Sequence, residues 1–303
     1  MGQAAALIHA PIVPLLPPLV ELEGGDEHLV RLWLHGKSVC TRDAYRRDVL
    51  QFNRFVGVTL REISLEHLQR YADHLEALGL ADATRARRIS AVKSLLTFGQ
   101  RTGYLIYNVG AAISVPRIRN RLAERILPEA HVQRILALES DPRDHAMLRL
   151  FYATGARVSE ICGLQVRDLQ PRVDRRSGRD AGQVTLYGKG GKTRAVLVSP
   201  DTWAALRPLV EGRAPDDAVF RSRRGGHLHR SQVLRIVRRA ARRAGIDLNV
   251  SPHWLRHAHA SHALDRGAPA HLVRDTLGHA SLVTTNQYVH ARPDESSGQY
   301  LGV

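Results

Sequence analysis

At 303 residues the chain exceeds a typical single domain, so two domains that each bury their own core are expected. Its formal net charge of +15 favours a polyanionic partner, nucleic acid ahead of an anionic membrane surface, because clustered cations attract polyanions and release their counterions. The only two cysteines, Cys40 and Cys162, exclude a dense disulfide framework and suit a reducing cytosol.

The first 25 residues are apolar, but Pro11, Pro14, Pro17 and Pro18 interrupt any helix there. No basic segment precedes the apolar run, so it predicts neither a signal peptide nor a membrane span. We expect an extended or disordered arm over residues 1–25 and no membrane partner.

From residue 26 to residue 112 the hydrophobic pattern is helical. Thr41 is a candidate N-cap for one amphipathic helix, and Ser64 is a candidate N-cap for another that ends at Gly79. A third helix is expected from Asp82 to Gly103. We therefore predict an all-α N-terminal domain over residues 26–112.

The third of these helices carries a basic face for which the sequence offers no matching acids. A solvated surface and a phosphate-contacting surface both fit this pattern, and the net charge favours contact with DNA. The candidate residues are Arg85, Arg87, Arg88 and Lys93.

A basic linker is expected over residues 113–127. Pro116 interrupts helix formation there, and arginines recur on both sides of it. Arg117 and Arg119 are further candidate DNA contacts.

The second half, residues 128–303, is predicted to be a mixed domain. Helical patterns cover residues 128–138 and 142–153. Two alternating runs, 183–188 and 193–198, flank a glycine-rich turn and predict a β-hairpin. Helical patterns dominate the rest, so the expected fold is mainly α with a small β-sheet.

Several polar residues of this half have spacings that suit an anion. Arg157 opens a predicted helix after Gly155, with Glu160 three residues on and on the same face. Such a pair alone is usually structural. His253 and Arg256 are also three residues apart on one helix face, where both can grip the same oxyanion.

Tyr288 follows near the C-terminus, and a lone tyrosine there is normally a packing residue. The combined set carries more information, since its arginines, histidines, lysine and tyrosine suit attack on a phosphodiester. In chain order the set is Arg157, Lys189, His253, Arg256, His279 and Tyr288.

Three further histidines, His257, His259 and His262, raise the alternative of a zinc site. The segment lacks an HExxH pattern, paired cysteines and a nearby carboxylate ligand. We therefore expect no metal, and we interpret His257 and His262 as core histidines whose polar atoms are satisfied.

In the order and the local sequence of these motifs, the chain resembles the tyrosine recombinase (phage integrase) family and is most similar to its Xer-type members. The resemblance runs from about residue 26 to the end through TGARVSE, the GKG turn, HWLR, LGH and the final tyrosine. Trp254 stands where smaller residues are frequent, and His259 replaces the usual aromatic residue.

The resemblance implies that Tyr288 is the nucleophile and forms a covalent phosphotyrosyl bond with DNA, without metal or nucleotide cofactor. Arg157 and Arg256 would be the catalytic arginines that stabilise the phosphate. His253 would assist Tyr288 as a base, and Lys189 would protonate the departing 5′ hydroxyl.

The remaining candidates have supporting roles. His279 is expected to donate to the scissile phosphate, and Glu160 to support Arg157 without touching the substrate. Lys192 is expected to contact the DNA backbone or to be solvated.

Double-stranded DNA is the expected partner, held in a C-shaped clamp between the two domains. The resemblance implies a homotetramer that pairs two DNA sites through a Holliday junction, in the cytoplasm and associated with the nucleoid. An accessory protein is a further candidate partner. Two rival functions are a topoisomerase-like enzyme that cuts and reseals one strand, and a catalytically silent, sequence-specific DNA-binding regulator.

Overall fold

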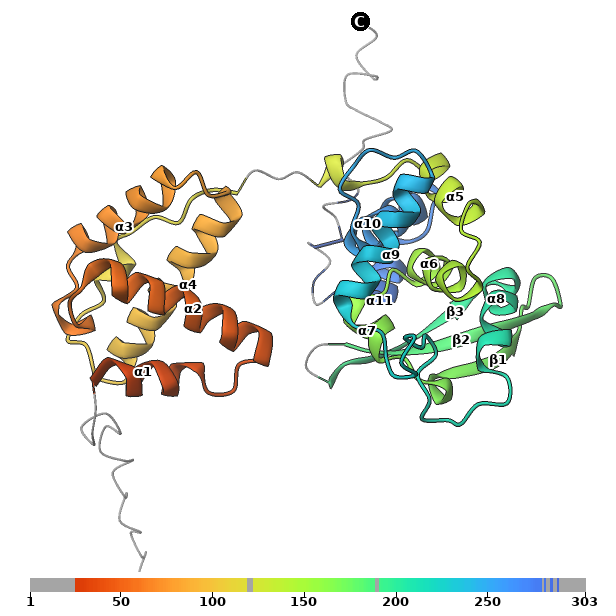
Figure 1. Cartoon of the computed structure of the whole chain (residues 1–303), viewed down its shortest axis with the longest axis horizontal. Coiled ribbons are helices and arrows are strands. Elements are labelled where there is room, and N and C mark those ends of the chain that lie inside the picture. Colours follow the sequence, from red (N-terminus) through yellow and green to blue (C-terminus); the bar gives the residue numbers. More distant parts are fainter. Residues whose placement is uncertain are drawn as a thin grey trace, which may run out of the picture. The chain divides into compact units, whose positions relative to one another are not determined.

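The computed structural model describes residues 25–118, 122–188 and 191–279, together with residues 281, 284, 285 and 288. The chain divides into two compact units between residues 119 and 120. Figure 1 shows that the first is helical and that the second combines helices with a small sheet. The predicted arm lies outside the described residues, apart from Gly25.

Over its described residues, 25–118, the first unit contains four α-helices and two short 3₁₀ helices. They are α1 (Gly25–Leu34), α2 (Val39–Val56), η1 (Leu60–Glu62), α3 (Leu65–Ala77), α4 (Asp82–Arg101) and η2 (Val109–Ala111).

The second unit holds the remaining helices and the three strands. They are η3 (Ala123–Arg125), α5 (Glu129–Ala137), α6 (Pro142–Thr154), α7 (Val158–Gly163), η4 (Val166–Asp168), β1 (Leu169–Val173), β2 (Asp180–Tyr187), β3 (Thr193–Val198), α8 (Pro200–Val210), α9 (Arg230–Arg243), α10 (Pro252–Asp265) and α11 (Ala270–Leu277).

The first unit is held together by one apolar core that all four α-helices share. Phe52 of α2 and Tyr71 of α3 meet edge to face at its centre, with ring centroids 5.0 Å apart. Asp26 of α1 accepts hydrogen bonds from the Leu60 amide and the Tyr104 hydroxyl, each at 2.8 Å. This carboxylate therefore ties α1 to the segments that follow α2 and α4.

The second unit is built around α6, which is buried on nearly every side. Met147, Leu148, Leu150 and Phe151 have no exposed surface, and α6 contacts α5, α8, α10 and β3. The sheet has the order β1-β2-β3 and is antiparallel throughout. A helix without a polar face can only be accommodated inside the domain.

The predicted fold class is confirmed, since the first unit is all-α and the second is mainly α with a small sheet. The hairpin is confirmed as β2 and β3, and the Ser64 cap is confirmed because its hydroxyl accepts from the His67 amide. The predicted boundaries at residues 112–113 and 127–128 stay predictions.

Two local features differ from the sequence prediction. Helix α2 begins at Val39 with Ser38 as its N-cap, so the Thr41 cap is wrong; the Ser38 hydroxyl accepts from the Thr41 amide. Strand β1 was not predicted, and it contains Pro171, which has no backbone N–H to donate. Its place at the sheet edge tolerates that loss.

None of the described helices is both long enough and apolar enough to cross a membrane.

Gly182 of β2 tests how closely α8 packs on the sheet. A β-carbon at this position would overlap the indole ring of Trp203. We expect Gly182→Ala to destabilise the protein by about 1–3 kcal/mol, because the overlap forces the ring or the strand to move. Urea unfolding measures the change.

The matched control is Gly163→Ala at the end of α7, where a β-carbon has nothing within 4 Å. It should be neutral or slightly stabilising. Equal unfolding midpoints for Gly182→Ala and wild type would contradict the close packing.

Candidate active site

Arg157 and Glu160 are brought together by the turn between α6 and α7. Gly155 ends α6 in a left-handed conformation with φ of 57°, which a glycine adopts without strain. The Glu160 carboxylate then accepts from the Arg157 amide at 2.7 Å and from its Nη1 at 3.0 Å. The TGARVSE segment therefore fixes this pair locally.

Arg194 of β3 is a third member of this cluster, and the sequence analysis missed it. Its two Nη atoms donate to the two Glu160 oxygens at 2.9 and 2.7 Å. Burial alone would raise the pKa of Glu160, but the hydrogen bonds from Arg194 and Arg157 outweigh it and lower the pKa. A usable signal was present, since Arg194 lies on the same face of β3 as the buried Val196 and Val198.

Arg256 of α10 is buried, with 4% of its surface exposed. Its Nη1 donates to the Gly155 carbonyl at 2.5 Å and its Nη2 to the Leu277 carbonyl at 2.8 Å. Burial, then repulsion from Arg157 and Arg194, lowers its pKa to about 10, so it remains a cation at neutral pH. No carboxylate pairs with Arg256 directly among the described residues.

The three arginines converge on the C-terminal end of α11. The last carbonyls of a helix have no partner within the helix and carry partial negative charge. Each of three consecutive carbonyls accepts from a different guanidinium. The pairs are Arg194 with Thr276 at 2.6 Å, Arg256 with Leu277 at 2.8 Å, and Arg157 with Gly278 at 3.2 Å.

The cluster has an excess of positive charge. Three guanidinium groups face one carboxylate, Glu160, which gives 3 − 1 = +2. The nearby rings of His257 and His279 are neutral at pH 7, since burial, followed by positive neighbours, lowers the pKa of each to about 4. The site is therefore suited to an anion.

Tyr288 lies against this cluster, with 6% of its surface exposed. It packs in an apolar group with Ile126 and Leu277, and burial raises the pKa of its phenol, although Arg256 lowers it. The His279 ring is parallel to the Tyr288 ring within 8°, at 6.4 Å between centroids.

His257 makes the hydrogen bond to the Tyr288 hydroxyl, with 2.8 Å between the oxygen and Nδ1. The sequence analysis interpreted His257 as a core histidine whose polar atoms are satisfied, and the structure shows that its partner is the Tyr288 hydroxyl. No hydrogen bond joins His253 to Tyr288 in the part of the chain that is described. The His253 side chain is open to solvent, but the protein atoms around its ring partly desolvate it, and this desolvation, then Arg256 and Arg157, lowers its pKa.

Lys189 lies outside the described residues. Its neighbour Gly188 is at the site, because a β-carbon there would be 3.4 Å from a Glu160 oxygen. Lys192 is exposed, and its carbonyl accepts from the Gly188 amide at 2.7 Å. Gly188 and Lys192, which flank the turn between β2 and β3, are therefore hydrogen-bonded to each other beside the arginine cluster.

The prediction that the basic face of α4 has no matching acids is wrong, because two of its arginines form ion pairs. Arg85 pairs with Glu76 at 3.0 Å and with Asp82 at 2.9 Å, because those acids lie one helical turn away or on the preceding helix. Arg87 pairs with Asp48 of α2.

The other candidate DNA contacts differ in their surroundings. The Lys93 ammonium donates to the Ala111 carbonyl at 3.4 Å and to that of Ile113. Arg88 is half-buried and Arg117 is exposed, while Arg119 lies outside the described residues.

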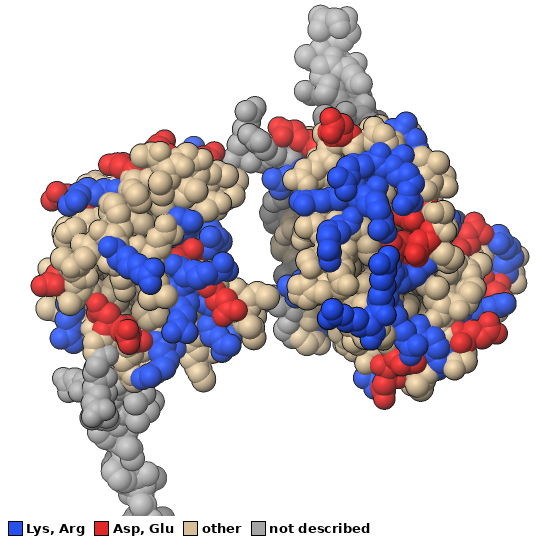
Figure 2. All heavy atoms as spheres, in the orientation of Figure 1, with Lys and Arg blue, Asp and Glu red and all other residues tan. Residues whose placement is uncertain are grey.

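Helix α9 carries an arginine row that the sequence analysis did not single out. Arg235, Arg238 and Arg242 are exposed and spaced along one face, and none has an ion pair with a described acid. Figure 2 shows Lys and Arg side chains gathered where α9 lies in Figure 1. The spacing in RSQVLRIVRRAARR was the available signal.

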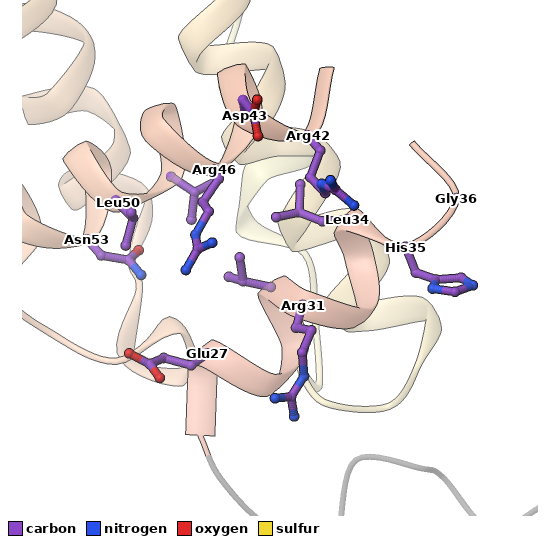
Figure 3. Close-up of a pocket in the computed structure, with 12 residues that line it drawn as sticks. Glu27, Arg31, Leu34, His35, Gly36, Arg42, Asp43, Arg46, Leu50 and Asn53 are labelled. Atoms are coloured by element: carbon purple, nitrogen blue, oxygen red, sulfur yellow. The ribbon is translucent and has the colours of Figure 1, made fainter. Parts of the chain in front are cut away.

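The first unit has a cavity of about 690 Å³ between α1 and α2. Val30, Leu34 and Val49 form part of its lining, and Figure 3 shows Arg46 extending from α2 toward α1. Arg42 and Arg46 have no ion pair among the described residues, so they are further candidates for phosphate contacts. Within the described ranges, no group of three or more His, Cys, Asp or Glu residues is placed to hold a metal ion.

Comparisons with known proteins agree with this arrangement. Residues 125–295 match the phage integrase family, and residues 26–103 match the N-terminal SAM-like domain of phage integrases. The chain is 34% identical to a tyrosine recombinase of Pseudothermotoga lettingae, over 83% of this chain and 87% of that protein. It is also 34% identical to the tyrosine recombinase XerD of Shewanella oneidensis, over 88% of this chain and 91% of that protein.

Solved structures share the fold at lower identity. A lambda integrase (75-356) dimer bound to a COC′ core site has a TM-score of 0.71 at 20% identity, over 89% of this chain and 95% of that one. A XerH recombinase bound to its difH substrate has a TM-score of 0.67 at 19% identity, over 91% and 84%.

The chain therefore belongs to the phage integrase family of tyrosine recombinases, enzymes that cleave and rejoin DNA strands. The resemblance to Xer-type members is confirmed.

The buried histidines predict a pH-dependent stability. Burial lowers the pKa of His259 to about 4 from 6.5, despite the hydrogen bond from its Nδ1 to the Tyr152 carbonyl. The unfolded state then binds protons first, so stability is complete above pH 6.5 and is lost as pH falls toward 4. Between pH 7.5 and pH 5, we expect the free energy of unfolding of His259→Phe to fall by about 2 kcal/mol less than that of wild type.

Urea unfolding at both pH values measures this difference. His271→Phe, at an exposed position of α11, is the control and should keep the wild-type pH dependence. A His259→Phe variant as acid-sensitive as wild type would show that His259 is not the titrating group.

Proposed function

We propose that this enzyme is a site-specific recombinase in which Tyr288 attacks a DNA phosphodiester, forms a 3′-phosphotyrosyl bond and releases a 5′ hydroxyl. One observation carries the proposal: a buried tyrosine lies beside an arginine cluster whose charge exceeds that of its carboxylate by two. A phosphodiester carries one negative charge, which increases on the non-bridging oxygens as attack proceeds.

Arg157 and Arg256 are assigned to those oxygens. A guanidinium has five N–H donors, and the bonds to Glu160 and to backbone carbonyls leave each arginine with donors to spare. Glu160 and Arg194 keep Arg157 in place. His253 and His279, which adjoin the cluster, are assigned as neutral donors to the phosphate.

Lys189 is assigned as the acid that protonates the departing 5′ oxygen. The proposal draws support from the position of Gly188 beside Glu160, because Lys189 is the next residue in the chain. The phosphotyrosyl ester retains the energy of the broken bond, so a 5′ hydroxyl of a partner strand reverses the step without ATP. Exchange between two sites needs a tetramer on paired double-stranded DNA.

Both units are proposed to contact the duplex. In the first unit the candidates are on α2, α4 and the linker, and in the second they are on α9 and at Lys192. An accessory protein and association with the nucleoid in the cytoplasm remain part of the proposal.

Removal of the nucleophile is the direct test. Tyr288→Phe, incubated with nicked DNA from the flanks of its own gene, should form no protein–DNA adduct that survives SDS, because the attacking oxygen is absent. Wild type and Tyr187→Phe, altered at an exposed tyrosine of β2, should both form it.

The rival functions give other products. Tight and specific binding by wild type without an adduct would indicate a silent regulator. Adducts that lead only to relaxed DNA, never to recombined strands, would indicate a topoisomerase-like enzyme.

The arginine row of α9 is tested through the salt dependence of DNA binding. Replacing Arg235, Arg238 and Arg242 together by alanine should weaken binding to duplex DNA and lower the slope of log K against log salt by about 3, one for each lost phosphate contact. Fluorescence anisotropy across a salt series gives both values.

The control replaces three arginines that are as exposed but paired with acids. They are Arg167 with Asp216, Arg179 with Asp201, and Arg207 with Asp180. Equal slopes for the two triple variants would mean that α9 makes no phosphate contacts.

A further inference from the structure

We infer that His257, and not His253, holds the Tyr288 hydroxyl for attack and takes up its proton as the phosphotyrosyl bond forms. This inference rests on the proposed function. It starts from the 2.8 Å contact between His257 Nδ1 and the Tyr288 oxygen, which is the reacting atom. The two ring centroids are 5.7 Å apart and the rings are tilted by 42°, so they meet through this hydrogen bond and not by stacking.

The direction of the hydrogen bond follows from the state of each partner. Burial, then repulsion from His253, Arg256 and Arg125, lowers the pKa of His257 to about 4, so its ring is neutral at pH 7. Burial raises the pKa of Tyr288, so its phenol keeps its hydrogen. The phenol therefore donates to a bare Nδ1, and the hydrogen of the neutral ring is on Nε2.

The helix explains why adjacent residues have different tasks. Consecutive positions on an α-helix point about 100° apart. Arg256 therefore faces the Gly155 and Leu277 carbonyls, while His257 faces Tyr288. The phosphate-binding group and the proton acceptor are set side by side on α10.

Substrate turns this resting contact into a proton transfer. The groups that face His257 are His253 and Arg256 on α10, Arg125 of η3, and Tyr288 and His279 from the last segments. Burial and the positive charges of Arg256 and Arg125 make His257 a poor base until a phosphate adds negative charge beside Arg256. The Tyr288 proton then moves to Nδ1, the oxygen–phosphorus bond forms, the bond to the 5′ oxygen breaks, and that oxygen takes its proton from the acid assigned above.

His253 is less suited to this role. Its ring centroid is 6.5 Å from that of His257, and it is exposed near Arg256 and Arg157, where a phosphate would lie. Tyr288 is held independently of His257 by its apolar neighbours, including Ile126 and Leu277. Substitution of His257 is therefore expected to leave Tyr288 in place. A slower reaction in such a variant then reports the loss of the proton acceptor.

The test compares His257→Asn, His257→Leu and wild type on a nicked duplex in which wild type forms its adduct. Asparagine has an oxygen near the position of Nδ1 but takes up no proton at neutral pH. We expect both variants to form the adduct about 10² to 10⁴ times more slowly than wild type at pH 7. In His257→Asn the rate should rise about tenfold per pH unit, because the phenolate must come from solvent, whereas the wild-type rate levels off.

A second substrate separates the two ends of the reaction. A sulfur in place of the bridging 5′ oxygen leaves without an acid, so it should not rescue either variant. Restoration of the wild-type rate on this substrate would assign His257 to the leaving group and overturn the inference. A His257→Asn rate and pH profile equal to wild type would overturn it as well.

The controls keep the inference separate from the proposed function. His271→Leu should cleave at the wild-type rate, and equal melting temperatures and DNA affinities show that the variants fold. If His257→Leu does not fold, the pH profile of His257→Asn decides. Absence of any adduct with wild type would instead overturn the proposed function.

Discussion

The C-terminal end of α11 is the feature on which the rest of the site depends. Its last carbonyls would be unsatisfied, and arginines from the start of α7, from β3 and from α10 donate to three of them in succession. This arrangement joins segments that are far apart in the chain and aims three cations at one place. Glu160 orders two of the cations without cancelling them.

Burial then determines how the other groups behave. The histidines around the cluster are held neutral because a further positive charge in a buried, cationic site is costly. A neutral ring can accept the Tyr288 proton, which a protonated ring cannot do, and it can still donate one hydrogen bond to a phosphate. The same burial keeps the phenol protonated until substrate arrives.

Much of the fold could be predicted from local sequence. The Ser64 cap, the left-handed Gly155 and the hairpin that holds Lys189 follow from short-range chemistry, and the TGARVSE and HWLR motifs located the arginines. The contact between His257 and Tyr288 could not be predicted, because it depends on how α10 is rotated against a distant segment. Glu76 and Asp48, which pair with Arg85 and Arg87, were missed for the same reason, since they come from neighbouring helices. Asp82, the other partner of Arg85, lies three residues earlier on the same helix and could have been found from helical spacing. The inward position of Arg194 could have been predicted, because it lies on the same face of β3 as Val196 and Val198.

The central claim is that the excess positive charge of the arginine cluster stabilises the negative charge of the phosphate. It is tested by adduct formation on DNA that carries either a normal phosphate or an uncharged methylphosphonate at the cleavage site, with wild type and Arg157→Ala. The account predicts that Arg157→Ala fails on the phosphate and regains much of its activity on the methylphosphonate, because the charge that the arginine neutralises is gone. An Arg157→Ala enzyme equally inactive on both substrates would contradict it.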